Sequence, residues 1–199
     1  MDIKSVANTG VSFMALENKL GITDSTELAK AEERISKTKA LEMFQQGLLD
    51  TFEVGTFRGL SQIHKYLFDE IYDFAGQVRT VNIAKGGFRF APVLYLTPAL
   101  ENISRMPQST FDEIIAKYVE MNVAHPFREG NGRSTRLWLD AILKKELCQA
   151  VDWSKNARVF CSRVQKGFSV TDRFVIQSLV RFSTKKGGKH YGSKQGHVG

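Results

Sequence analysis

The chain has 199 residues and a formal net charge of +7, with 42% hydrophobic and 25% charged residues. This length and composition predict one globular domain with a sizeable core. No apolar run approaches the ~20 residues that a membrane-spanning helix needs, so we expect no membrane partner.

The N-terminal quarter predicts a helical extension, residues 1–50. Residues 1–10 lack the basic-then-apolar pattern of a secretion signal, which favours a cytoplasmic location. Residues 24–46 form a polar, charge-laced helix that starts near Asp24 and stops at Gly47. The next helix, residues 57–74, repeats apolar side chains at helical spacing. They are Leu60, Ile63, Leu67, Ile71 and Phe74.

In the middle of the chain the periodicity of the side chains changes from helical to strand-like. Residues 78–92 alternate side chains as a strand does and contain Gly86 and Gly87, which predicts a β-hairpin. Ser109 and Thr110 precede Asp112 and Glu113, a capping box that opens another helix. We expect its inward face to comprise Ile114, Ile115, Tyr118, Val119 and Asn122, and Pro126 to end it.

The C-terminal part predicts two further helices, at about residues 155–166 and 171–183, that close the bundle. Cys148 and Cys161 lack metal-ligand spacing, so we expect two buried thiols in a reducing compartment. Residues 184–199 hold four lysines and no acid among Gly and Ser, which predicts a disordered basic tail. Because the excess charge is concentrated there, we do not expect nucleic acid as a partner; contact of the tail with nucleic acid or a membrane surface is the weaker alternative.

One stretch carries most of the functional information. It reads His125-Pro126-Phe127-Arg128-Glu129-Gly130-Asn131-Gly132-Arg133-Ser134-Thr135-Arg136. The two glycines allow positive φ and a close approach of the backbone to a ligand. A Gly-Asn-Gly turn that opens a helix directs unpaired N–H groups toward one point, and the helix dipole adds positive potential. The stretch therefore predicts an anion site.

The charged residues around this turn suit a polyphosphate. Arg133 and Arg136 lie one helical turn apart and can reach the same ligand. Glu129 is a hard oxygen ligand that suits Mg²⁺ shared with phosphate oxygens, and His125 can accept a proton near neutral pH. Each residue alone also has a structural interpretation: a satisfied histidine, an ordinary turn, a solvated salt-bridge cluster. Their ordered combination at a helix start favours function.

This stretch resembles the signature of the Fic family, His-Pro-Phe-x-(Asp/Glu)-Gly-Asn-Gly-Arg-x-x-Arg, at every fixed position. The resemblance covers roughly residues 20–180. Residues 73–79 and 85–90 look like the segment that leads into the family's β-hairpin flap, and residues 116–122 look like the helix that delivers the motif. It implies a mainly α, Fic-type helical bundle with a short β-hairpin flap, in a single domain over residues 1–183.

The resemblance implies transfer of AMP from ATP to a Ser, Thr or Tyr hydroxyl of a target protein, with ATP as cosubstrate and Mg²⁺ as cofactor. His125 would deprotonate the hydroxyl, and Glu129 would hold the metal. The implied nucleotide-binding set is Lys85, Asn122, Val123, Ala124, Gly130, Asn131, Gly132, Arg133, Ser134, Thr135 and Arg136. The flap would dock the target through Gly87, Phe88, Arg89 and Phe90. Phe88 and Phe90 have the alternative interpretation of strand residues that pack inward.

Other functions stay open at this point. The same site suits removal of AMP, or another nucleotidyl or phosphoryl transfer. A catalytically inactive nucleotide-binding interaction module is an alternative of a different class. The intact Gly-Asn-Gly-Arg sequence favours adenylyl transfer, and the complete set of motif residues argues against an inactive module.

Regulation is a further point of comparison with the family. Many Fic proteins carry an inhibitory helix, (Ser/Thr)-x-x-x-Glu-(Gly/Asn), whose glutamate pairs with the second motif arginine, here Arg136. One string fits, residues 97–102 with Glu101, but it follows the flap, away from either usual position. We expect that Arg136 is not blocked within the chain, and that the enzyme is either unrestrained or held by a separate small antitoxin protein.

Overall fold

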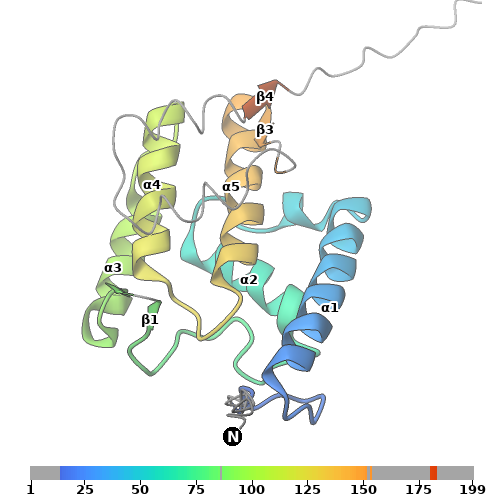
Figure 1. The fold of residues 1–199 in the computed structure, drawn as a ribbon. Helices are drawn as coiled ribbons and strands as arrows, with labels where there is room; N and C mark the ends of the chain where they lie inside the picture. The colour runs from blue at the N-terminus through green and yellow to red at the C-terminus, as the bar shows by residue number, and fades with distance from the viewer. Residues whose placement is uncertain (1–13, 86, 152, 154–179, 183–199) are drawn as a thin grey trace, which may run out of the picture.

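The computed structural model describes residues 14–85, 87–151, 153 and 180–182. Its elements are α1 (Ser25–Gln45), η1 (Leu48–Thr51), α2 (Phe57–Phe68), β1 (Ala84–Lys85), β2 (Phe88–Arg89), α3 (Val93–Arg105), α4 (Phe111–Ala124), α5 (Asn131–Leu147), β3 (Gln149–Val151) and β4 (Val180–Phe182). Helices α4 and α5 pack side by side, α3 covers α4, and α2 lies between α1 and α5 (Figure 1). The predicted mainly helical bundle with a short antiparallel hairpin is confirmed.

The first two helices start at side-chain caps. The Asp24 carboxylate accepts hydrogen bonds from the amides of Thr26 and Glu27, at 2.9 and 2.8 Å. Gly47, at φ 67°, follows α1, in agreement with the predicted end. Helix α2 is shorter than predicted and stops at Phe68. A turn after it still buries Ile71 completely, so the apolar spacing continues beyond the helix.

Helix α4 has the predicted capping box. The Glu113 amide donates to Thr110 Oγ1 at 3.3 Å, and the Thr110 amide donates to the Glu113 carboxylate at 3.0 Å. Of the expected inward residues, Ile114, Ile115 and Tyr118 are buried, while Val119 and Asn122 are half-buried.

The hairpin and helix α3 depart from the expectation. The paired strands comprise two residues each, Ala84 opposite Arg89 and Lys85 opposite Phe88, so most of residues 78–92 is loop. Helix α3 was not predicted. Its Leu96, Leu100 and Ile103 are buried at helical spacing, and this packing stabilises a helix that contains the unfavourable Pro98.

At the C-terminal side, the prediction of a helix through residue 183 is wrong at residues 180–182. These residues form β4, which pairs with β3 just after α5. The expected buried thiol at Cys148 is also wrong: this residue is exposed and ends α5 with φ 54°. The predicted helix at 155–166, Cys161 and the predicted tail at 184–199 lie outside the described residues.

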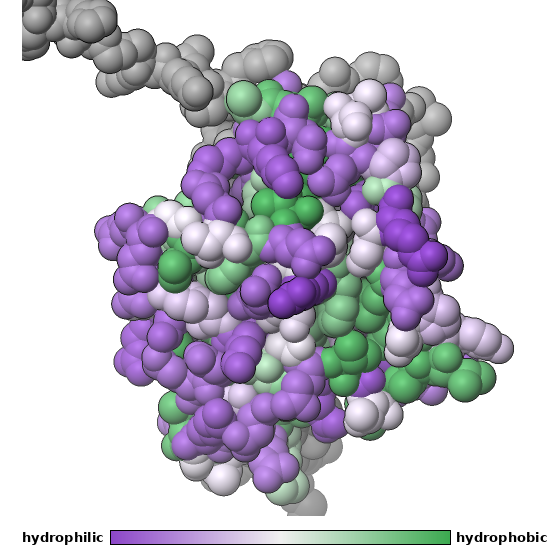
Figure 2. All heavy atoms as spheres, turned by 180° about the vertical axis from the view of Figure 1, so that it is seen from behind, coloured by the Kyte–Doolittle hydropathy of each residue, from purple (hydrophilic) through white to green (hydrophobic). Residues whose placement is uncertain are grey.

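The core lies between α2, α4 and α5. Its fully buried large side chains include Leu60, Ile63, Tyr118, Phe127 and Trp138. The opposite side of the molecule from that in Figure 1 is mainly hydrophilic, with small separate hydrophobic patches (Figure 2). None of the helices in the described part of the chain has the length and apolarity to cross a membrane.

Candidate active site

The motif loop, residues 125–130, joins adjacent ends of α4 and α5, and the hairpin lies near the same end of the bundle (Figure 1). The Asn131 side chain closes this loop. Its Oδ1 accepts from the Phe127 amide at 2.9 Å, and its Nδ2 donates to the Phe127 carbonyl at 2.7 Å. Because Asn131 is only 3% exposed, its side chain shapes the loop, and its backbone is the part available to a ligand.

His125 lies at the C-cap of α4 with φ 50° and ψ 63°, a left-handed conformation that is uncommon for residues other than glycine. Its Nδ1 lies 3.2 Å from the Asn122 carbonyl oxygen. A carbonyl only accepts, so Nδ1 carries the hydrogen and Nε2 is the acceptor of the neutral ring. Burial lowers the His125 pKa to about 4; the Asn122 carbonyl opposes this shift, while the charges of Arg79 and Lys85 add to it. The imidazole is therefore neutral at neutral pH.

The flap lies over this histidine. The Phe90 ring stacks on the His125 imidazole with centroids 3.7 Å apart, and Phe88 meets Phe90 edge to face at 5.1 Å. Phe90 is thus buried, Phe88 is half-buried, and Gly87, Arg89 and the β1 residue Lys85 are exposed.

Arg79 connects the flap to the motif, a role that the sequence pattern alone did not indicate. This buried side chain donates to the carbonyls of His125 at 2.8 Å, Val81 at 2.7 Å and Ala124 at 3.2 Å, and also to that of Ala91. Its own amide donates to the carbonyl of Pro126 at 2.8 Å. A charged residue inside the alternating segment 78–92 was the available signal, because a buried arginine needs several acceptors.

The start of α5 combines a tight position with an open one. Gly130 has φ 76°, and a Cβ there would lie 2.5 Å from the Phe68 ring, so a larger residue is excluded. At Gly132 a Cβ would meet no atom of the described residues within 4 Å, which leaves room for a ligand beside the backbone. The amides of Asn131 and Gly132 belong to the first turn, where a helix leaves N–H groups without intrahelical acceptors.

The remaining predicted nucleotide-binding residues contribute differently. The Ser134 hydroxyl bonds to the Gly130 carbonyl at 3.0 Å, and the Thr135 hydroxyl bonds to the Asn131 carbonyl at 2.8 Å. Both side chains are buried within the bundle rather than directed to the anion site. In α4, Asn122 Nδ2 donates to the Tyr118 carbonyl at 2.8 Å. Val123 is half-buried, and Ala124 is buried.

Arg133 is held by helix α1. Its guanidinium pairs with the Glu32 carboxylate, donates to Ser36 Oγ at 3.1 Å and lies 4.9 Å from the centre of the Phe68 ring. The Tyr72 hydroxyl donates to the other Glu32 oxygen at 3.1 Å. Burial raises the Glu32 pKa, and Arg133 opposes that rise. The sequence pattern contained no signal for this long-range pair.

Arg136 lies 5.8 Å from the centre of the Trp153 ring. The carboxylate of Asp140 accepts from Trp153 Nε1 at 2.7 Å and from the Val151 amide at 3.2 Å, so it ties the chain after α5 to this helix. Both motif arginines line one cavity of about 210 Å³ between α1 and α5. The structure therefore brings the two predicted phosphate ligands to a common space.

Glu129 is the only predicted metal ligand. Its carboxylate, 46% exposed, lies 3.8 Å from Arg133 Nη2 and accepts from the Gly130 amide at 2.9 Å. The described residues contain no group of three or more His, Cys, Asp or Glu that could hold a metal by themselves. A single exposed carboxylate beside an anion site fits Mg²⁺, which commonly takes most of its ligands from phosphates and water.

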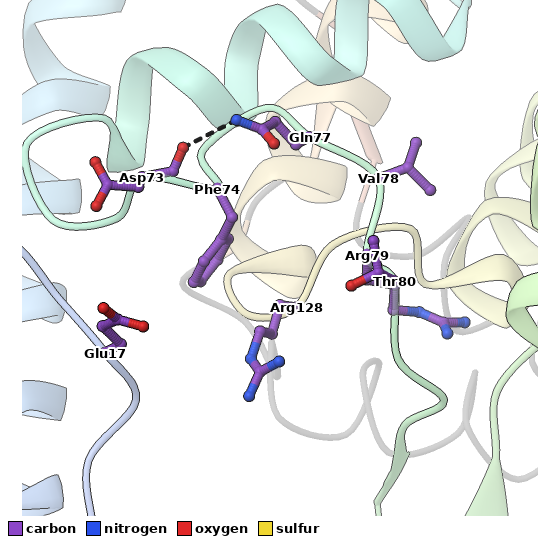
Figure 3. A pocket seen from close by; sticks show the side chains of 8 residues that line it. All are labelled: Glu17, Asp73, Phe74, Gln77, Val78, Arg79, Thr80 and Arg128. Carbon is purple, nitrogen blue, oxygen red and sulfur yellow. Dashed lines mark hydrogen bonds between the residues drawn. The ribbon is translucent and has the colours of Figure 1, made fainter.

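Arg128, at the variable position of the motif, lines a separate pocket of about 500 Å³ (Figure 3). The other walls are Glu17, the loop of residues 73–74 and residues 77–80. Gln77 supports the loop of residues 73–74, because its side-chain Nε2 donates to the Asp73 carbonyl at 3.0 Å. The variable motif residue thus faces a different space from the two motif arginines.

Comparison with known proteins agrees with this geometry. The sequence model of the Fic/DOC family matches residues 56–143, from the start of α2 into α5. The chain is 29% identical over 186 residues to the protein adenylyltransferase VbhT of Bartonella schoenbuchensis, covering 87% of this chain and 37% of that protein. It is 30% identical over 142 residues to the probable protein adenylyltransferase Fic of Salmonella typhimurium, covering 64% of this chain and 66% of that protein. The chain belongs to the Fic/DOC family.

Solved structures share the fold. The BepC protein of Bartonella tribocorum, with bound AMPPNP, has a TM-score of 0.69 at 20% identity, covering 84% of this chain and 92% of that chain. The N-terminal Fic domain of a VirB-translocated effector of Bartonella quintana, with bound ADP, has a TM-score of 0.69 at 19% identity, covering 85% and 92%. The arrangement of helices and flap is therefore that of Fic domains.

Proposed function

We propose that this protein is a protein adenylyltransferase, which moves AMP from ATP to a Ser, Thr or Tyr hydroxyl of another protein and releases pyrophosphate. One observation carries the proposal. His125, a neutral imidazole whose Nδ1 is engaged by the Asn122 carbonyl, is one short loop away from the glycine-lined start of α5. This pairing supplies a proton acceptor for the hydroxyl and a site for the phosphates of the cosubstrate.

In the proposed step, the target hydroxyl oxygen forms a bond to the α-phosphorus of ATP, and its proton passes to Nε2 of His125. The bond from the α-phosphorus to the oxygen that bridges to the β-phosphate breaks, and pyrophosphate leaves with the electron pair. Such transfers depend mainly on positioning and on stabilising charge at phosphate oxygens. Stacking on Phe90 and the bond to Asn122 hold the imidazole in one orientation, as positioning requires.

The phosphates would lie against the amides of Gly130, Asn131 and Gly132. Arg136 and Arg133 line a cavity between α1 and α5 and would balance the charge of the distal phosphates. Glu129 would hold Mg²⁺ together with phosphate oxygens, and the metal would offset negative charge on those oxygens.

Two relatives with names that state protein adenylyltransferase, VbhT and Fic, support this function, and two structural neighbours were solved with the adenine nucleotides AMPPNP and ADP. The chain spans 37% of the length of VbhT, and the match to that protein covers the Fic site. The proposal therefore concerns the Fic site alone.

The partners follow from the exposed parts of the site. A target protein with an accessible hydroxyl would pair with the flap, where Arg89 in β2 and Gly87 just before this strand are exposed. Glu101, from the one string that fits the inhibitory pattern, is exposed on α3 and pairs with Arg105 at 3.2 Å. Glu101 is thus engaged on its own helix. For restraint of the enzyme we propose a separate small antitoxin protein, with an unrestrained enzyme as the alternative.

The test is incubation of the purified protein with ATP, Mg²⁺ and a lysate, followed by mass spectrometry of modified proteins. We expect target hydroxyls that gain one AMP unit, and no gain with His125→Ala. A gain of one phosphate would replace the proposal with phosphoryl transfer, and release of AMP from premodified proteins would replace it with removal.

A further inference from the structure

His64 is a buried histidine that the proposed reaction does not use. It lies near the centre of α2 with 0% exposure, and its ring stacks on Phe127 of the motif loop with centroids 3.8 Å apart. A second ring, that of Phe68, lies 4.7 Å away on the same helix. The imidazole is therefore confined between α2 and the motif loop.

Both ring nitrogens have defined partners. The Gly76 amide donates to Nδ1 at 2.9 Å, which makes Nδ1 the acceptor of the ring. Nε2 therefore carries the hydrogen and donates to the Glu129 carbonyl at 2.8 Å. A ring that accepts at Nδ1 and donates at Nε2 is the neutral imidazole.

This contact determines how one peptide of the motif is turned. The Glu129 carbonyl and the Gly130 N–H belong to the same planar trans peptide, so they point in opposite directions. With the carbonyl directed inward to His64, the N–H is directed away from it, where it donates to the Glu129 carboxylate at 2.9 Å. This N–H therefore binds an anionic oxygen in this structure.

Gly130 makes this orientation easy to lose. Glycine populates both signs of φ at similar free energy, so the backbone at this position has little intrinsic resistance to a peptide flip. A flip would turn the Glu129 carbonyl oxygen toward the anion site, where it would repel a phosphate. Donation from His64 is the interaction that opposes the flip from the interior side.

We infer that His64 is a positioning residue that holds the Glu129–Gly130 peptide with its N–H toward the nucleotide phosphates. The inference rests on the proposed function, since it assigns this N–H to a phosphate of ATP. His64 touches neither phosphate nor target in this scheme; it acts through the backbone of the motif loop.

Two substitutions separate the two contacts of the ring. In His64→Gln the amide nitrogen takes the place of Nε2 and keeps the donor to Glu129. In His64→Asn the amide oxygen takes the place of Nδ1. This variant keeps only the acceptor for the Gly76 N–H. Both variants lose the stacking on Phe127, so each is the other's control for stability.

The readout is the dissociation constant for ATP, with inorganic pyrophosphate as a second probe, by calorimetry on the folded variants. We expect His64→Gln to stay within about threefold of wild type and His64→Asn to bind about tenfold more weakly, the range of one hydrogen bond. Equal weakening in both variants, or none in either, would overturn the inference.

A measurement on the wild-type protein avoids dependence on the folding of the variants. The ¹⁵N resonances of the His64 ring should report the Nε2–H tautomer at neutral pH, and pyrophosphate should shift the Gly130 amide resonance. An Nδ1–H tautomer would overturn the inference, because that ring cannot donate to Glu129. AMP transfer by wild type together with such a result would leave the proposed function standing, whereas wild type that neither binds ATP nor transfers AMP would overturn the proposed function.

Discussion

The ring of Phe90 lies face to face with the imidazole of His125, at a centroid distance of 3.7 Å and an angle of 18° between planes. One is the residue that follows the flap strand β2, and the other is the proposed base at the end of α4. The flap therefore shields the proposed base from water.

Shielding by Phe90 should be visible in the pH dependence of the reaction. Burial holds the His125 pKa at about 4, so wild-type activity should fall only when the pH drops toward that value. Phe90→Ala exposes the imidazole, and we expect its acid limb to move upward toward the ordinary pKa of histidine, about 6.5. Rates of AMP transfer between pH 4.5 and 8 give the measurement. Phe88→Ala, which removes the ring that does not stack on His125, is the control and should leave the limb in place.

Substitution of the base should separate chemistry from binding. We expect His125→Ala to slow AMP transfer by about 10²–10⁴-fold, the usual effect of losing a general base. ATP affinity should stay close to that of wild type, because the phosphates are assigned to α5 and the motif arginines. Labelling with radioactive ATP and calorimetry give the two quantities. Equal labelling by the variant would refute the assignment of His125.

Arg136 should distinguish nucleotides by their distal phosphates. We expect Arg136→Ala to weaken ATP binding by about tenfold or more and to change AMP binding little, because only ATP carries phosphates that reach this side chain. The comparison of both dissociation constants is the measurement. Arg105→Ala, which removes an exposed arginine of α3, is a matched control. A similar loss for ATP and AMP would rule out this role.

Glu101 should not act as an internal brake. Its described ion pair is with Arg105, one turn along the same exposed helix face. We therefore expect Glu101→Gly to leave ATP turnover and self-labelling within about twofold of wild type, since exposed pairs of this kind contribute little. A silent wild-type enzyme that becomes active on this substitution would show that residues 97–102 are inhibitory.

The buried His64 should make stability depend on pH. Its folded pKa of about 4 lies below the unfolded value of about 6.5. The stability that the neutral ring contributes is therefore complete above pH 6.5 and is lost as the pH falls toward 4. Asp140 acts in the opposite sense, because burial raises its pKa to about 6 in the folded state. The His64→Gln variant keeps Asp140. Subtracting the pH dependence of its unfolding free energy from that of wild type therefore isolates the contribution of the histidine.

Denaturant titrations at pH 7.5 and pH 5 test this expectation. Between these values the unfolding free energy of wild type should fall by about 2 kcal/mol more than that of His64→Gln. The same pH dependence in both proteins would contradict a buried neutral histidine at this position.

Local signals determined much of this protein. The capping box at Thr110 and Glu113, the caps at Asp24 and Gly47, and the glycines of the motif act over a few residues, so the sequence contains them in full. The motif by itself places His125, Glu129 and both arginines beside a helix start, because their positions relative to that start follow from their spacing along the chain. Apolar periodicity predicted the end of α2 wrongly, because the helical spacing of apolar residues continues beyond Phe68 into a turn.

Tertiary structure decided the parts that depend on partners distant in the chain. Glu32 lies 101 positions before Arg133, and His64 lies 65 positions before Glu129, so no periodicity relates them. Burial of these polar groups is favourable only where a partner from another helix completes their hydrogen bonds. The pairing of β4 with β3 likewise depends on an edge that exists only after α5 has packed. Sequence spacing thus determined which chemistry the motif can perform, and helix packing determined which tautomers, counter-ions and peptide orientations that chemistry has available.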